Sequence, residues 1–282
     1  MIAWLSEPFT YEFMQRALMA SLIVGVLCSV VGCFVVLRAM AFLGDALAHA
    51  ILPGIAVAYL LGANLLVGAL VAAVLVAVGI GLFSRRGGVK EDTAIGVLFA
   101  AALALGVVLI STVHSYATDL THILFGNVLG VTTADLWLTG GLALAVVVIV
   151  ILLFKELELA AFDPVLAHVL GKRPETLRFT MLVLLAITIV VSLQTVGVGL
   201  VAAMLVTPAA TAYLLTRRLA AMMLVAAVIG AGSSVTGLYV SYYLDVASGA
   251  AVVLTATAAF LLAFLFAPRR GVLARRWRSR AA

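Results

Sequence analysis

The sequence predicts an all-α, polytopic integral membrane protein with eight to nine transmembrane helices. Of its 282 residues, 66% are hydrophobic and only 10% are charged, whereas soluble globular domains are about 45–50% apolar and about 25% charged. The mean hydropathy is +1.29. These values exclude a soluble enzyme, a nucleic-acid-binding module, a disordered chain and a disulfide scaffold. Because no soluble segment interrupts the apolar runs, residues 1–282 are expected to form a single transmembrane domain.

Stretches without charged residues define the predicted spans, because a helix needs about 20 apolar residues to cross the hydrocarbon core. Two stretches, Ala46–Ser84 and Phe179–Thr216, are long enough for a pair of spans. Each pair has a break near its middle, at Gly62–Asn64 and at Gly197–Gly199. Single spans are expected in Ala17–Leu37, Thr93–Thr118, Leu136–Phe154, Leu219–Leu244 and Val246–Pro268. The count is nine, or eight if one half-length segment enters the membrane without crossing it.

Lysine and arginine occur in every second loop, and this alternation predicts the topology because cytoplasmic loops carry an excess of both residues. The loops around Arg85–Lys90, Lys155–Arg178 and Arg217–Arg218 are therefore expected in the cytoplasm, together with the basic tail 269–282. With nine spans, the N-terminus lies outside. The tail acts as a topology anchor in the simplest interpretation, and binding to anionic lipid or nucleic acid is the alternative.

The strongest candidate site is the pair Asp45 and His49 within an apolar segment. A carboxylate at the bilayer centre costs about 2.5–3.5 kcal/mol on insertion scales, so its presence indicates a function. Residues four apart share one helix face, and one carboxylate with one imidazole suits Mn(II), Zn(II) or Fe(II). Small residues around the pair should let another backbone approach closely, and Pro53-Gly54 should kink the helix just beyond.

A purely structural role for this pair is the alternative, in which Asp45 caps a helix and His49 is hydrogen-bonded in a packed interior. Two ligands are too few for a complete metal site, so the others must come from elsewhere in the chain or from a second copy. A second polar group, His114, Asp119 and His122, lies in a predicted outer loop. These three residues form either an ordinary polar loop or a weak entrance site that collects cations.

A short amphipathic helix is predicted over Asp163–Gly171, between two spans on the cytoplasmic side. Asp163 followed by Pro164 is typical of an N-cap and a first helical position, and Gly171 is typical of a helix stop. A helix of about eight residues cannot cross the membrane, so it should lie along its surface, with Leu166 and Val169 among its apolar residues. The chain contains no G-x-x-x-x-G-K-S/T phosphate loop and no H-E-x-x-H zinc helix. We therefore expect neither catalytic residues nor a permanently bound cofactor.

Several motifs between Arg16 and Pro268 resemble those of one family of membrane proteins. They are Val36–Arg38, Leu43–Ala50, Asp92–Gly96, Leu124–Gly130, Phe162–Pro164, Gln194–Gly199, Leu205–Ala212 and Ser241–Asp245. The chain resembles the membrane-spanning permease of bacterial ABC importers for manganese, zinc and iron(II). Through the resemblance, Asp45 and His49 match positions that ligate the ion in the pathway. The segment Asp163–Gly171 matches the coupling helix that docks on the ATPase.

The resemblance also implies partners and a location. It implies a bacterial cytoplasmic membrane, a dimer of permeases related by a two-fold axis, two cytoplasmic ATPase subunits that bind ATP, and an external metal-binding solute-binding protein. The transported ion would be Mn²⁺ or Zn²⁺, because both accept the same Asp/His ligands. The second permease would be another copy of this chain or a different one. Two other functions stay open: a secondary metal transporter driven by an ion gradient, and a membrane receptor or assembly protein that transports nothing.

Overall fold

The computed structural model describes residues 7–86, 91–112, 130–267 and 271, and the regular structure in these ranges is entirely helical. In chain order the elements are η1 (Glu7–Thr10), α2 (Glu12–Leu37), α3 (Ala41–Ala50), α4 (Leu52–Leu60), α5 (Leu65–Arg86), α6 (Glu91–Ser111), α8 (Thr133–Leu152), α9 (Phe154–Phe162), α10 (Pro164–Val169), α11 (Pro174–Val196), α12 (Val198–Leu215), α13 (Leu219–Leu244) and α14 (Ser248–Phe266). The all-α prediction is confirmed.

Eight segments of the described chain are long and apolar enough to cross a membrane. They are α2, the combined α3–α4 segment, α5, α6, α8, α11, α13 and α14. Helix α12 is also apolar, but its apolar segment, Val201–Leu215, is shorter than those of the eight. Each of the nine spans predicted from the sequence therefore contains a helix, and α12 is the helix that separates a count of eight spans from a count of nine.

The predicted breaks lie where the sequence places them. Gly62 ends α4 with a positive φ of 62°, and Gly197 separates α11 from α12 with a φ of 80°, a conformation that costs glycine nothing. The kink after the candidate site is confirmed as well, because α3 ends at Ala50 and Pro53 lies in the first turn of α4. Three predicted starts were wrong by five residues: the spans begin at Glu12, Ala41 and Pro174 rather than at Ala17, Ala46 and Phe179.

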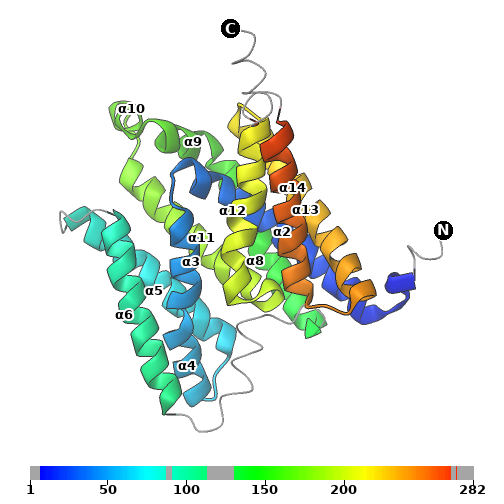
Figure 1. Cartoon of the computed structure of the whole chain (residues 1–282). Helices are drawn as coiled ribbons and strands as arrows, with labels where there is room; N and C mark the ends of the chain where they lie inside the picture. The colour runs from blue at the N-terminus through cyan, green and yellow to red at the C-terminus, as the bar shows by residue number, and fades with distance from the viewer. Residues whose placement is uncertain (1–6, 87–90, 113–129, 268–270, 272–282) are drawn as a thin grey trace, which may run out of the picture.

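Helix α2 forms the centre of the bundle, in contact with α13, α12, α8 and α11 (Figure 1). Small residues bring α2 and α13 together: a Cβ on Gly25 would lie 2.8 Å from the carbonyl oxygen of Gly230. The Ser234 hydroxyl then donates a hydrogen bond across the interface to the Ser21 carbonyl, at 2.9 Å. In lipid, such close packing and interhelical hydrogen bonding replace the hydrophobic effect as the source of helix association.

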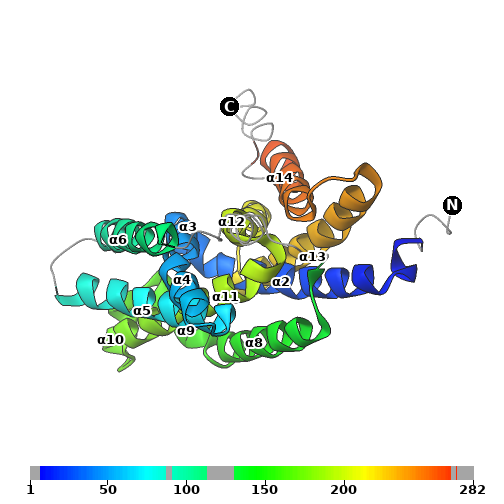
Figure 2. The ribbon, with the colours of Figure 1, turned by 90° about the horizontal axis from the view of Figure 1, so that it is seen from below.

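Helices α3, α6 and α12 lie along one side of the bundle, and α5, α8 and α10 lie along the other (Figure 2). The contacts agree, since α3 packs against both α12 and α6. Helices α5, α6, α8 and α14 keep mostly exposed apolar surfaces, as expected of helices that face lipid tails or another membrane subunit.

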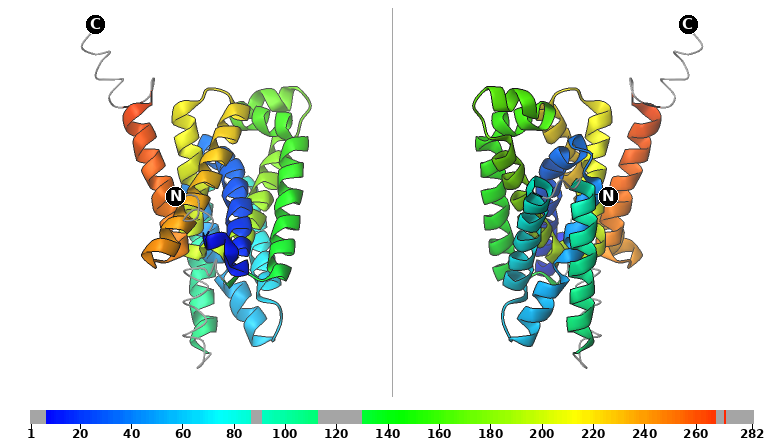
Figure 3. Two further views of the ribbon diagram at one scale, coloured as in Figure 1. Left: turned by 90° about the vertical axis from the view of Figure 1, so that its right-hand side faces the viewer. Right: turned by 90° about the vertical axis from the view of Figure 1, so that its left-hand side faces the viewer.

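The two ends of the bundle differ in charge. Helices α9 and α10 share one end with the α12–α13 junction, whereas the α4–α5 and α13–α14 turns lie toward the other (Figure 3). Lys172 and Arg173 follow α10, and Arg217-Arg218 form the α12–α13 junction. The described basic loops that the alternation rule assigns to the cytoplasm thus lie at one end of the molecule.

Candidate functional site

Helix α3 has a buried face of small and apolar residues, and this face holds the helix in the bundle. Its buried residues are Leu43, Gly44, Ala46, Leu47, Ala48 and Ala50. Gly44 packs directly on α12, where an added Cβ would lie 3.3 Å from Leu205 Cδ1. The expectation that these small residues let another backbone approach closely is confirmed at Gly44, where that backbone is α12 of the same chain. They pack within the same chain, because a narrow face lets α3 lie close to α12.

The opposite face of α3 carries Asp45 and His49. The two side chains lie one helical turn apart, with His49 Nε2 3.7 Å from Asp45 Oδ1. Asp45 is not a helix cap, because Met40 holds the N-cap position of α3. The side chains are 42% and 27% exposed respectively, so His49 does not lie in a closed interior. The structure therefore shows neither feature of the structural alternative: Asp45 does not cap the helix, and His49 is not enclosed in the interior.

Two phenylalanines border the pair. Phe99 of α6 lies with its ring centroid 6.2 Å from that of His49, and 6.1 Å from that of Phe42 in an edge-on arrangement. Phe42 is on the same exposed face of α3 as Asp45, with 55% of its surface accessible. The pair therefore lies beside aromatic rings from two helices, α3 and α6. Sequence reasoning missed Phe99, because nothing in the spacing along the chain places α6 beside α3.

The separation of the two ligand atoms suits a shared metal ion. Two donors at about 2.1 Å from an ion, at a tetrahedral angle, lie about 3.4 Å apart, so the pair needs to close by only about 0.3 Å. No group of three or more His, Cys, Asp or Glu residues able to hold a metal occurs within the described ranges. His114, Asp119 and His122 lie outside the described residues. The described chain thus supplies two ligands, and an ion needs more.

The pair lies in the first half of its span. Asp45 is the fifth and His49 the ninth residue of α3, so they lie about 6 Å and about 12 Å along a span of about 30 Å. Asp45 is thus nearer to the end that follows Arg38 than the sequence interpretation assumed. His49 lies closer to the middle of the span.

The predicted surface helix is α10, Pro164–Val169, which is six residues long rather than about eight. Asp163 is its N-cap and accepts a hydrogen bond from the Leu166 amide at 2.9 Å, and Pro164 follows at the first helical position. Gly171 ends the unit with a φ of 74°. The sequence signals for start and stop are therefore confirmed, and the helix is short because these signals lie so close together.

An ion pair fixes the far end of this unit to α9. Lys172 Nζ donates a hydrogen bond of 3.0 Å to Glu156 Oε1. The Lys172 ammonium beside Glu156 holds the pKa of that carboxyl below its ordinary value. Because the folded-state pKa is lowered, the contribution of the pair is present at neutral pH and is lost as the pH falls through that value. Lys172 is exposed and Glu156 is partly exposed, so the pair positions the unit more than it stabilises the fold.

The surface of α10 is strongly apolar. Val165 is 73% exposed, Val169 is 75% exposed, and Leu166 and Leu170 are also exposed, while Ala167 is fully buried against the bundle. Sequence reasoning identified Leu166 and Val169 but missed Val165 and Leu170. A short helix with one buried contact shows apolar side chains around most of its circumference, which a one-face pattern does not anticipate. Contiguous exposed apolar surface of this kind marks an interaction site.

The fold and the site together define a class. A multi-pass helical bundle that holds a carboxylate and an imidazole inside one of its spans is typical of membrane transport proteins. The family model of the ABC 3 transport family matches residues 10–267. The chain belongs to this family, and it is a membrane-spanning permease subunit of an ABC transporter and a multi-pass protein of the bacterial cytoplasmic membrane.

Relatives cover nearly the whole chain. The "Manganese transport system membrane protein MntC" of Halalkalibacterium halodurans is 50% identical over 276 residues, which are 98% of this chain and 94% of the relative. The "Probable iron transport system membrane protein" of Haemophilus influenzae is 39% identical, over 96% of this chain and 99% of the relative. The solved structure of PsaBC from Streptococcus pneumoniae in complex with Fab contains a chain with 40% identity and a TM-score of 0.87. The match covers 98% of this chain and all of that one.

Proposed function

We propose that this permease forms the membrane pathway for a divalent transition-metal ion, manganese first, in an ATP-driven importer. The observation that carries the proposal is the Asp45–His49 pair, held 3.7 Å apart on an exposed face of α3. A carboxylate oxygen and an imidazole nitrogen are ligands that Mn(II) accepts. The name of the relative from Halalkalibacterium halodurans supports manganese as the ion.

The metal site is completed by a second copy of the chain. One copy offers two ligands on the exposed face of α3, beside Phe42. Two copies related by a two-fold axis would offer two carboxylates and two imidazoles, enough for a tetrahedral ion or for six-coordination completed by water. Two carboxylates would also offset the desolvation of a doubly charged ion. The site must release its ion as well as bind it, so each ligand pair is expected to bind only transiently.

Iron(II) is the second candidate ion and zinc the third. The relative from Haemophilus influenzae is named for iron transport, and the same Asp/His ligands suit Fe(II) and Zn(II). The chemistry of the pair argues against Cu(I), which prefers thiolate and thioether ligands. Neither cysteine lies in α3, because Cys28 and Cys33 are both buried in α2.

The energy of ATP hydrolysis is transmitted from the ATPase to the permease through α10. Its exposed apolar residues lie on the end of the bundle assigned to the cytoplasm, where a separate ATPase subunit would dock. One hydrogen bond connects this end of the bundle with the segment before α3: Arg38 Nη2 donates it to the Ala160 carbonyl of α9, at 3.4 Å. Arg38 lies in the turn between α2 and α3, so a movement of α9 and α10 would reach the helix that carries Asp45. A solute-binding protein would deliver the ion at the opposite end.

The test is metal uptake by proteoliposomes that contain the permease with its ATPase and solute-binding protein. Asp45→Asn and His49→Ala should each reduce the initial rate of radioactive manganese uptake at least tenfold, because each removes one ligand from both copies. Asp245→Asn is the matched control, since it makes the same chemical change at an exposed left-handed position that asparagine tolerates. Wild-type uptake by Asp45→Asn would refute the site.

Two further measurements separate the alternatives. Uptake that needs only an ion gradient, without the ATPase, would identify a secondary transporter. Absence of metal uptake under all conditions, with an intact assembly, would identify a receptor or assembly protein. Competition of manganese uptake by iron(II) and by zinc would rank the three ions.

A further inference from the structure

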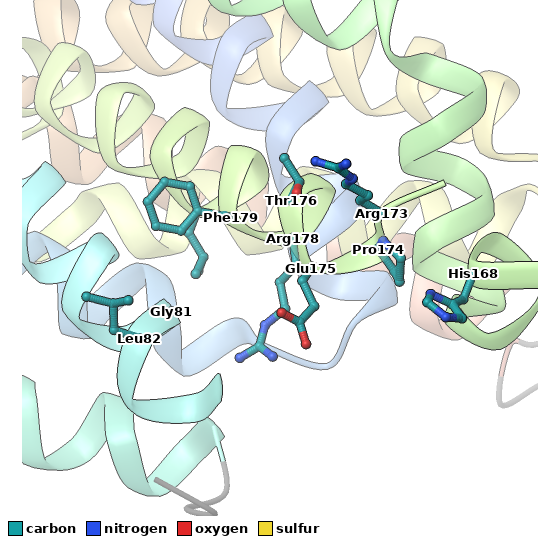
Figure 4. A pocket seen from close by; sticks show the side chains of 10 residues that line it. Gly81, Leu82, His168, Arg173, Pro174, Glu175, Thr176, Arg178 and Phe179 are labelled. Carbon is teal, nitrogen blue, oxygen red and sulfur yellow. The ribbon is translucent and has the colours of Figure 1, made fainter. Parts of the chain in front are cut away.

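A cavity of about 670 Å³ lies where the end of α5, the helix α10 and the start of α11 meet (Figure 4). Its lining includes Gly81 and Leu82 of α5, His168 of α10, and Arg173, Arg178 and Phe179 at the start of α11. None of these residues belongs to the Asp45–His49 pair. We propose that this cavity binds the headgroup of an anionic phospholipid from the cytoplasmic leaflet.

The charge of the lining favours an anion. Arg173 and Arg178 bring two permanent positive charges to the cavity, and His168 adds a third group that can carry a positive charge. Among the described lining residues, Glu175 is the only carboxylate. Figure 4 shows its side chain beside that of Arg178, whereas the Arg173 side chain points the other way, toward Thr176. Two guanidinium groups against one carboxylate leave the cavity positive. Guanidinium groups bind phosphate oxygens in a planar, two-pronged geometry.

The apolar part of the lining continues along α5. Gly81 brings the ring of Phe179 directly onto this helix, because an added Cβ would lie 3.0 Å from the ring. Leu82, which lines the cavity, is 47% exposed. It shares a helix face with three other exposed residues of α5, Val67, Val71 and Leu75, since their spacing places all four within about 80° around the axis. This apolar stripe runs from the cavity toward the opposite membrane surface.

A basic cavity beside an apolar stripe favours a lipid over a soluble anion and over the ATPase as the ligand. A free phosphate would use the arginines but not the apolar stripe beside them. The ATPase would use the exposed apolar residues of α10, of which none lines the cavity. The cavity lies between the ends of two spans, since the apolar segment of α5 ends at Ser84 and that of α11 begins at Pro174. Basic pockets between transmembrane helices on the cytoplasmic side are suited to acidic headgroups.

A bound headgroup would connect α10 with two spans. His168 belongs to α10, Leu82 to α5 and Arg178 to α11, and all three line the same cavity. The lipid would therefore stabilise the position of α10 relative to the bundle. This consequence depends on the proposed role of α10, whereas binding of the lipid does not.

Native mass spectrometry of the full-length permease in detergent tests the binding directly, with phosphatidylglycerol and phosphatidylcholine titrated separately. The wild type should bind phosphatidylglycerol in preference to phosphatidylcholine. The Arg173→Gln/Arg178→Gln variant should bind phosphatidylglycerol about 30-fold more weakly, at roughly fivefold for each arginine that contacts the headgroup. The matched control is Arg217→Gln/Arg218→Gln, which removes two exposed arginines at the same end of the bundle and should bind like the wild type.

A folding defect is separated from a binding defect by the Arg173→Lys/Arg178→Lys variant, which keeps both charges and should retain most of the binding. Unchanged phosphatidylglycerol binding by the double glutamine variant would overturn the proposal, as would equal binding of both lipids by the wild type. Inorganic phosphate that displaces the lipid completely at millimolar concentration would identify a free-anion site instead. Loss of ATPase co-purification with lipid binding intact would identify an ATPase contact instead.

Discussion

The exposed apolar surface of α10 leads to the most direct prediction. We expect the double substitution Leu166→Asp/Val169→Asp to leave the permease folded but to release its ATPase. In the permease alone Leu166 is 45% and Val169 is 75% exposed, so neither substitution removes a core contact. Surface changes of this kind usually alter the free energy of unfolding by less than about 0.5 kcal/mol.

The magnitude of the docking defect follows from the same exposed fractions. Full burial of a valine or leucine side chain contributes about 1.5–3 kcal/mol. If docking covers what is now exposed, the two residues together contribute about 2–3.5 kcal/mol, which corresponds to about 30- to 300-fold in Kd. This value is a lower limit, because two buried carboxylates add a desolvation cost.

The assay is equilibrium binding of purified ATPase subunit to the permease in lipid nanodiscs. The matched control is Leu61→Asp/Val246→Asp, which places the same two changes at exposed positions of the α4–α5 and α13–α14 turns, at the opposite end of the molecule. The control should bind the ATPase with wild-type affinity. A wild-type Kd for Leu166→Asp/Val169→Asp, or an equal loss in the control, would refute the assignment of α10 as the docking helix.

Three other predictions concern topology, the helix cap and the outer loop. Single cysteines at Ala63 and at Arg217, both exposed in the structure, should react with an impermeant maleimide from opposite sides of the membrane, and labelling of both from outside would contradict the topology. Asp163→Ala should destabilise α10 by about 1 kcal/mol and so raise the hydrogen-exchange rate of the Leu166 amide about fivefold, while Asp163→Asn should keep the cap and the slow exchange. His122→Ala should reduce manganese uptake only partly, and a complete loss at saturating manganese would show that His122 belongs to the main ion site.

The positions of the spans follow from the sequence, because a helix in lipid must satisfy its own backbone and needs a fixed apolar length to do so. The breaks at Gly62 and Gly197 follow as well, since glycine adopts the positive φ found there without strain. The ends of α10 were also predictable, because Asp163, Pro164 and Gly171 are local signals that need no partner elsewhere in the chain.

The pairing of Asp45 with His49 was likewise determined locally, because a separation of four residues fixes their distance on any helix. The local sequence did not determine which contact the small residues around the pair would make. Gly44 could have served a contact with another chain, and the structure shows it packed against Leu205 of the same chain. Sequence pattern does not decide between these uses in a membrane protein, because buried faces and lipid-facing faces are both apolar.

Only the tertiary structure brought together groups from separate helices. Phe99 lies beside His49 because α6 packs on α3. Arg178, Leu82 and His168 line one cavity because α11 starts beside the end of α5 and beside α10. The chain segments between these groups are long, and no local interaction fixes their separation. The sequence by itself determined where the membrane helices lie and which polar residues they carry, whereas helix packing decided which of those residues meet, because contacts between spans depend on shape complementarity and not on a hydrophobic pattern.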